Sequence, residues 1–175
     1  MIFSLITLLV VAIIVMFVFL TSRTFEIKKS IVVNNDISTA FGYMKHIKNH
    51  DHWSPWRKKD RNIQQEFIGE DGKVGFISKW SGNSDVGVGE QEIINVVENK
   101  IVETKIKLIK PIKSDAIGII ETEDIGMMRT KVTLIFHAKN QMPTNILMLF
   151  FNLEKAVGKD FEEGLNNLKQ LLEKK

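Results

Sequence analysis

The sequence contains no cysteine, which excludes disulfide bonds, thiolate metal sites and a cysteine nucleophile. It also has no Gly-x-Ser-x-Gly elbow and no Gly-x-x-x-x-Gly-Lys phosphate loop. Gly87-Val88-Gly89 precedes strand-like residues rather than a helix, which is not the pattern of a dinucleotide-binding loop. The sequence therefore gives little indication of an enzyme, and we expect no cofactor and no bound metal.

An excess of one charge is also lacking. The 24 basic and 21 acidic side chains give a formal net charge of +3. A nucleic-acid-binding domain normally carries a concentrated basic face, and this sequence has none, so we expect no nucleic-acid partner. The apolar fraction of 44% and the charged fraction of 26% are typical of a globular protein.

The first residues form a long apolar run. No charged residue occurs from Ile2 to Leu20. At about 1.5 Å per residue, a helix of this length crosses the ~30 Å hydrocarbon core of a bilayer. A cleaved signal peptide is the alternative, but it would need a basic start and small residues before the cleavage site. We therefore predict a single-pass membrane anchor in residues 1–22 and a folded domain in residues 24–175.

The flanking charges predict which side of the membrane holds the domain. Arg23, Lys28 and Lys29 follow the apolar run, and no charged side chain precedes it. Positive residues near a membrane span favour the cytoplasmic side. We expect a membrane protein whose C-terminal domain is cytoplasmic.

The end of the chain predicts a long amphipathic helix that begins near Pro143. Its apolar residues recur every three or four positions, the period of one helical face. They are Ile146, Phe150, Leu153, Val157, Phe161, Leu165, Leu168 and Leu172. Such a helix needs a large apolar partner surface, which the preceding strands can provide.

Alternating apolar residues predict strands at 24–34, 63–68, 74–80, 87–97, 102–108, 114–123 and 130–139. Turn residues separate them, including Glu70-Asp71-Gly72, and favour an antiparallel meander. A short helix carrying Phe41 and Met44 is expected from a cap at Asp36 or Ser38 to about Asn49. The fold class is α+β, with a curved antiparallel sheet wrapped around a long C-terminal helix.

This order of elements is the helix-grip plan, and the sequence resembles the polyketide cyclase/dehydrase-type members of the SRPBCC superfamily, the START and Bet v 1-like group. The segments that carry the resemblance are Lys29-Ser30-Ile31-Val32-Val33, Trp53-Ser54-Pro55-Trp56, Gly72-Lys73-Val74-Gly75, Trp80-Ser81-Gly82-Asn83, Gly87-Val88-Gly89, Ile109-Lys110-Pro111 and 157–165. The resemblance implies an apolar ligand held between the sheet and the long helix.

Inward-facing residues of the predicted elements are the candidate ligand site. They are Trp53, Trp56, Phe76, Trp80, Ile106, Leu134, Phe136, Phe150, Glu154, Val157 and Phe161. A curved sheet that does not close on its helix leaves an apolar pocket. The alternative is a filled core, because protein interiors are densely packed.

Glu154 lies near the apolar stripe of the long helix. A carboxylate there can orient a polar head group, or act as an acid or base with a raised pKa. The alternative is a glutamate at the edge of the stripe that reaches water.

Two further groups are ambiguous. His46, His50 and His52 have part of the spacing that zinc requires, but no second cluster supplies more ligands, which favours solvated histidines. The basic run Arg57-Lys58-Lys59-Asp60-Arg61 suits anionic head groups beside Trp56, whereas most charge runs are solvated loops.

We therefore expect a membrane-anchored helix-grip domain that binds or transfers a hydrophobic small molecule or lipid. A cyclase- or dehydratase-like enzyme and a non-catalytic interaction domain with a packed core are the alternatives. The sequence does not determine the oligomeric state.

Overall fold

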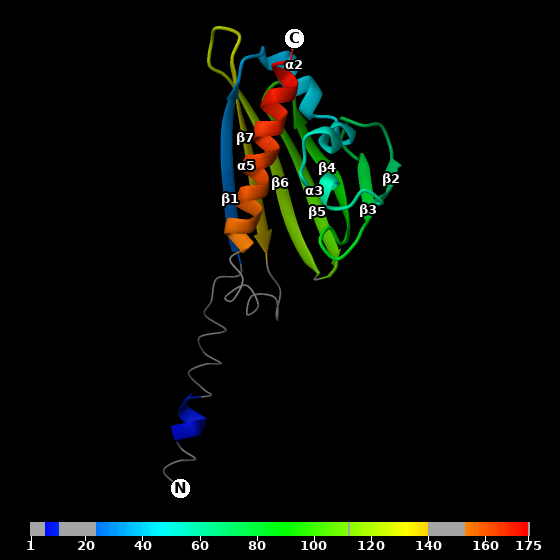
Figure 1. Ribbon diagram of the computed structural model, residues 1–175, viewed down its shortest axis with the longest axis vertical. Helices are drawn as coiled ribbons and strands as arrows, with labels where there is room; N and C mark the ends of the chain where they lie inside the picture. Colours follow the sequence, from blue (N-terminus) through cyan, green and yellow to red (C-terminus); the bar gives the residue numbers. More distant parts are fainter. Residues whose placement is uncertain (1–5, 11–23, 112, 140–152, 175) are drawn as a thin grey trace.

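The computed structural model describes residues 6–10, 24–111, 113–139 and 153–174. Seven antiparallel strands form one sheet in the order β1-β7-β6-β5-β4-β3-β2. A long C-terminal helix lies across one face of this sheet, and short helical turns cover the same face beside it (Figure 1). The predicted α+β helix-grip architecture is confirmed.

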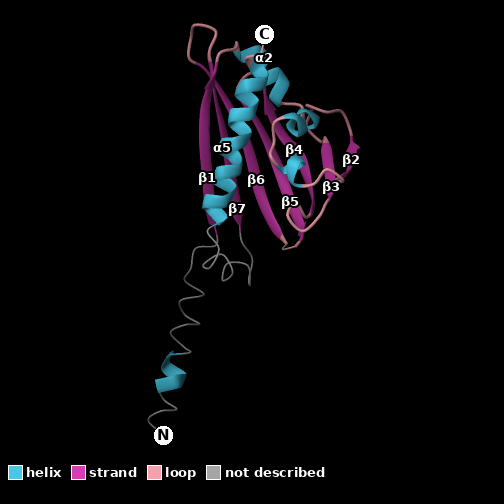
Figure 2. Ribbon diagram, viewed as in Figure 1, coloured by secondary structure: helices cyan, strands magenta, loops and turns pink. Residues whose placement is uncertain are grey.

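The elements follow the predicted order along the chain. Figure 2 distinguishes the helices from the strands by colour. The strands are β1 (Thr24–Val33), β2 (Gln64–Ile68), β3 (Ile77–Ser81), β4 (Val88–Val97), β5 (Ile101–Lys110), β6 (Ser114–Asp124) and β7 (Thr130–Lys139). The helices are α2 (Ile37–Met44), the 3-10 helix η1 (Ile47–His52), α3 (Trp56–Lys59) and α5 (Leu153–Leu172).

The face of the sheet toward α5, here called the inner face, follows from the pleat of the strands. One cross-strand row on it runs from Ile27 through Phe136, Gly118 and Thr104 to Ile93. Neighbouring inner residues pack with α2, η1 and α5 into one core. Its fully buried side chains include Val33, Phe41, Met44, Phe76, Ile93, Val102, Val132, Leu165 and Leu168.

Strand β4 contains an irregularity that changes which residues face inward. The pairing with β5 shifts between Ile93 and Asn95, as in a β-bulge. Ile93 is opposite Thr104 and Val96 is opposite Val102, so both face inward although three positions separate them. The extra residue, Ile94, is exposed.

The first helix is shorter than predicted. Asp36 caps α2 by accepting a hydrogen bond from the Thr39 backbone N–H at 3.0 Å, as expected. However, α2 ends at Met44 rather than near Asn49. The reason is local, because the Asn49 side chain donates to the Tyr43 carbonyl and the His50 ring to the Met44 carbonyl. These carbonyls therefore do not accept from a continuing helix.

The connection from β2 to β3 is longer than the tight hairpin expected at Glu70-Asp71-Gly72. Gly72 and Gly75 both have positive φ, and the intervening Val74 is exposed rather than inward-facing on a strand. The Asp71 carboxylate accepts from the backbone N–H groups of Ile47 and Lys48 at 2.8 and 3.2 Å. This loop therefore caps the start of η1.

Two predictions fall largely outside the described residues. The expected beginning of the C-terminal helix at Pro143, with Ile146 and Phe150, lies in residues 140–152. The apolar run from Ile2 to Leu20 is described only over residues 6–10, which are helical. Within the described ranges, no helix combines the length and the apolarity that a membrane crossing requires.

Gly89 on β4 makes room for an aromatic ring. A Cβ there would lie 2.5 Å from Cζ2 of Trp80 and 2.6 Å from the Lys107 carbonyl oxygen. We expect Gly89→Ala to displace the indole or the strand and to lower the free energy of unfolding by about 1–3 kcal/mol.

Urea denaturation measures this effect. Gly42→Ala in α2 is the matched control, because its Cβ would meet no atom within 4 Å. That change should stabilise the protein by about 0.5–1 kcal/mol. Equal stability of the two variants would contradict the close packing of Trp80 on Gly89.

Candidate functional site

The Trp53-Ser54-Pro55-Trp56 segment docks onto α5. The Trp53 side chain is buried, and its ring lies against the helix at Gly164, where a Cβ would be 3.4 Å from ring carbons. The Asn167 side chain also donates to the Trp53 carbonyl at 3.0 Å. The buried indole and this hydrogen bond therefore hold the connection against the core.

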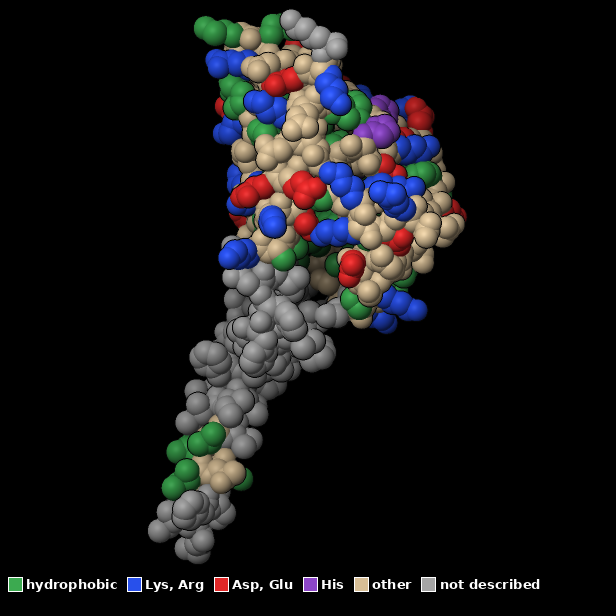
Figure 3. Space-filling view, in the orientation of Figure 1, with side chains coloured by type: hydrophobic (Ala, Val, Ile, Leu, Met, Phe, Trp, Pro, Cys, Tyr) green, Lys and Arg blue, Asp and Glu red, His purple; other side chains and the backbone are tan. Residues whose placement is uncertain are grey.

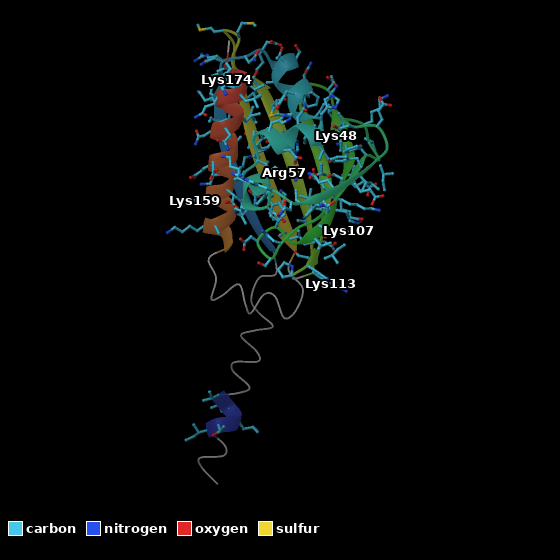
Figure 4. All side chains as sticks on the ribbon, turned by 45° about the vertical axis from the view of Figure 1, so that its right-hand side comes forward. Lys48, Arg57, Lys107, Lys113, Lys159 and Lys174 are labelled. Carbon is cyan, nitrogen blue, oxygen red and sulfur yellow. The ribbon has the colours of Figure 1, made fainter. Side chains whose placement is uncertain are left out.

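Trp56 and the basic run that follows it contact the outward side of the same helix. Trp56 Nε1 and Lys59 Nζ both donate to Asp160 Oδ2, at 3.2 and 2.6 Å. Lys58 pairs with Glu163 at 3.2 Å. These cations thus bind carboxylates of α5, which gives the run a role in holding the helix. Lys159 projects away from the sheet (Figure 4).

Strand β1 holds α5 from its other side. Lys29 forms an ion pair with Glu162. The helix also approaches β1 closely at Gly158, where a Cβ would lie 3.4 Å from the Lys29 side chain. The space-filling view shows mixed acidic and basic side chains along this face (Figure 3). Helix α5 is therefore fixed over the inner face from two directions.

Burial along the inner face is uneven. At the end near Val33 and the start of β5, inner residues such as Val102 and Val132 are fully buried. Toward the other end, where β1 begins and β5 ends, Ile106 and Leu108 are only half-buried, although the neighbouring Ala116 and Ala138 are buried. We call this second region the open end. Partly accessible apolar side chains under a helix are the surface that an apolar ligand requires.

The structure brings only some predicted site residues together at the open end. Phe136 and Phe161 meet edge to face, with ring centroids 6.3 Å apart, and Trp56 meets Phe161 at the same distance. Ile106, Trp80 and Val157 are half-buried, like Phe136 and Phe161.

Other predicted site residues lie elsewhere. Trp53, Phe76 and Leu134 belong to the packed core. Phe150 lies outside the described residues. Glu154 belongs to the described backbone of α5, but its side chain does not belong to the described part.

A series of hydrogen bonds on the inner face, here called the polar chain, was not predicted from the sequence. Gln91 Nε2 lies 3.0 Å from Thr104 Oγ1, and this hydroxyl donates to the Gly118 carbonyl at 3.1 Å. Thr104 is buried and Gln91 is half-buried. In the sequence, Gln91 and Thr104 look like ordinary strand residues, so only the pairing of β4 with β5 identifies this group.

The histidines do not converge. His46 faces Asp71 at 3.7 Å, His52 Nδ1 lies 2.7 Å from the Tyr43 hydroxyl, and His50 contacts the Met44 carbonyl. The described side chains contain no group of three or more metal-ligating residues. His137 is exposed and faces Glu26 on the neighbouring strand β1.

An open groove of about 430 Å³ lies on the opposite, outer face of the sheet. Its lining includes Lys28, Lys131, Glu121 and Glu123. Lys28 pairs with Glu121 at 3.9 Å, and Lys131 with Glu123 at 3.5 Å. Its lining thus combines these two ion pairs with Lys100 and with the apolar residues Val97 and Ile101.

No protein-family model matches the sequence, and no curated protein matches it. Solved structures do match. Norcoclaurine synthase from Thalictrum flavum, in complex with dopamine and hydroxybenzaldehyde, has a TM-score of 0.63 at 14% identity, over 87% of this chain and 88% of that chain. Ara h 8.0201 has a TM-score of 0.59 at 11% identity, over 85% and 97%.

A third match is the di-domain ARO/CYC StfQ from the steffimycin biosynthetic pathway, with a TM-score of 0.62 at 8% identity. It covers 86% of this chain and 51% of that chain. These neighbours are Bet v 1-like, SRPBCC proteins, which confirms the predicted resemblance at the level of the fold. The narrower polyketide cyclase/dehydrase-type assignment stays a prediction.

We expect His50 to make the stability of the protein depend on pH. Burial lowers the pKa of His50, partly opposed by its hydrogen bond to Met44 and by the charges of Asp71 and Asp51. The unfolded chain therefore binds more protons than the folded one between the lowered pKa and the ordinary value of about 6.5. The contribution of neutral His50 to the free energy of unfolding should be fully present above about pH 6.5 and should decrease as the pH falls below that value.

Urea unfolding between pH 7.5 and pH 5 measures this dependence. His50→Gln keeps a donor for the Met44 carbonyl but cannot titrate, so its profile should be flatter than that of the wild type. His137→Gln removes an exposed imidazole and is the matched control. A wild-type slope that survives in His50→Gln would contradict this assignment.

Proposed function

We propose that this protein binds or transfers a hydrophobic small molecule or lipid between the open end of the inner face and α5. The observation that supports this most directly is the half-buried cluster of Ile106, Phe136 and Phe161. Removing apolar surface from water contributes about 25 cal/mol per Å². A ligand that covers these side chains would therefore gain appreciable affinity.

The fold comparisons are consistent with this proposal. Norcoclaurine synthase, which has the same fold, holds two small aromatic molecules in its solved structure. Such likeness does not identify a ligand for this chain, because one fold supports many functions. The supporting argument is therefore the chemistry of the open end itself.

We further propose that residues 1–22 anchor the domain to a membrane. The apolar run ends at Leu20, and β1 begins at Thr24 at the open end of the sheet. The four residue steps from Leu20 to Thr24 span at most about 14 Å, so the open end would remain close to the lipid. Arg23, Lys28 and Lys29 favour a cytoplasmic domain. A tether of this kind raises the effective concentration of a lipophilic ligand at the site.

Two alternatives make different predictions for the same site. A cyclase- or dehydratase-like enzyme would consume its ligand and would depend on an acid or base such as Glu154. A packed interaction domain would bind no lipophile at all. Ligand recovery from the purified protein separates these alternatives from a carrier.

Native mass spectrometry with lipid extraction, on full-length protein purified gently from membranes, is the direct test. We expect a co-purified lipophile at about one per chain. Ile106→Trp should reduce its occupancy severalfold, because the larger side chain would occupy the proposed ligand position at the open end. Ile109→Trp is the matched control, since it changes an exposed isoleucine three residues along the same strand. A wild-type protein without any bound lipophile would contradict the proposal.

Membrane fractionation tests the anchor separately. Leu9→Arg combined with Val10→Arg should move the full-length protein to the soluble fraction, because each arginine costs about 2.5–3.5 kcal/mol at the centre of a spanning helix. Val97→Arg combined with Ile109→Arg adds the same charge to exposed positions of the domain and should leave it in the membrane. Wild-type protein in the soluble fraction would contradict the anchor.

A further inference from the structure

The polar chain from Gln91 to Gly118 lies beside the proposed ligand position. Thr104 is almost fully buried, and its hydroxyl has two neighbours, the Gly118 carbonyl oxygen at 3.1 Å and the Gln91 side chain at 3.0 Å. Gly118 is opposite Phe136 on the next strand, and Gln91 is opposite Ile106. The chain thus lies among the half-buried apolar residues of the open end.

Hydrogen-bond chemistry determines the orientation of the Gln91 amide. A threonine hydroxyl has one proton, and the Gly118 carbonyl can only accept. Because the proton is directed to Gly118, Thr104 Oγ1 must accept a hydrogen bond from its other neighbour. The Gln91 NH₂ group therefore faces Thr104, and its carbonyl oxygen Oε1 faces away. Among the described residues, Oε1 has no hydrogen-bond partner.

We propose that Gln91 Oε1 selects a ligand that carries a hydroxyl or N–H group on an otherwise apolar body. This inference rests on the proposed function and adds a chemical class to it. A donor on the ligand pairs with Oε1, whereas a hydrocarbon leaves this oxygen without a partner. An amide hydrogen bond contributes about 0.5–1.5 kcal/mol, which corresponds to a preference of about two- to tenfold.

The same geometry disfavours an ionised carboxylate. A carboxylate only accepts hydrogen bonds, so it would place two acceptors against each other at Oε1. The basic side chains that hold α5 do not compensate, because Lys29, Lys58 and Lys59 already pair with Glu162, Glu163 and Asp160. The site should therefore bind an alcohol or phenol better than the matching acid.

Three ligands with one ring system test this selectivity: naphthalene, 2-naphthol and 2-naphthoate. Equilibrium dialysis with full-length protein in lipid nanodiscs gives the affinities, and empty nanodiscs give the background from partitioning. We expect 2-naphthol to bind two- to tenfold more tightly than naphthalene, and 2-naphthoate to bind most weakly.

Substitutions connect the preference to the polar chain. Gln91→Leu should keep naphthalene binding and abolish the preference for 2-naphthol. Thr104→Val should reduce the preference because it releases the amide from its fixed orientation, whereas Thr104→Ser retains the hydroxyl and the preference. Gln64→Leu makes the same change at an exposed position of β2 and should behave like the wild type.

The outcomes separate the two proposals. If none of the three ligands binds, the proposed function fails and this inference fails with it. If all three bind with equal affinity, or if 2-naphthoate binds best, the site remains but the selectivity is wrong. A preference for 2-naphthol that survives in both Gln91→Leu and Thr104→Val would also overturn the role of Gln91.

Discussion

The packing of Trp53 against Gly164 is the contact on which the arrangement of the other elements depends. The buried indole lies against α5 at Gly164, and Asn167 secures the adjoining backbone. The connection that carries the indole also presents Lys58 and Lys59 to Glu163 and Asp160. Exposed ion pairs contribute little on their own, about 0–1 kcal/mol each. Their value here is to orient a helix whose position is already determined by apolar packing.

This arrangement divides the domain into two regions with different properties. Near Leu165 and Leu168, the helix, α2 and the sheet form one core in which the largest apolar side chains are fully buried. Toward the beginning of α5, the inner face becomes half-buried around Phe136 and Ile106. The first region can supply the stability of the fold, which leaves the second available for the proposed ligand.

Much of the fold was predictable because its signals are periodic. Alternation in Val102, Thr104 and Ile106 identified β5 and its inner face, and the spacing of Phe161, Leu165 and Leu168 identified α5. The end of α2 and the exposed Val74 were not predictable in this way, since side-chain hydrogen bonds and glycine conformations decided them. Gln91 was missed for a different reason. Its role depends on the register of β4 against β5, and a slip of one residue would have placed it on the outer face.

The bulge in β4 has a consequence for how the protein can change over evolutionary time. Because the pairing shifts between Ile93 and Asn95, the two halves of this strand keep separate inward phases. The half with Gln91 lines the open end, and the half with Val96 packs on the core. Substitutions in the half with Gln91 can therefore alter the surface of the open end while the half with Val96 keeps its packing on the core. Under the proposed function, ligand selectivity could thus change within this strand without a change in the residues that hold the fold together.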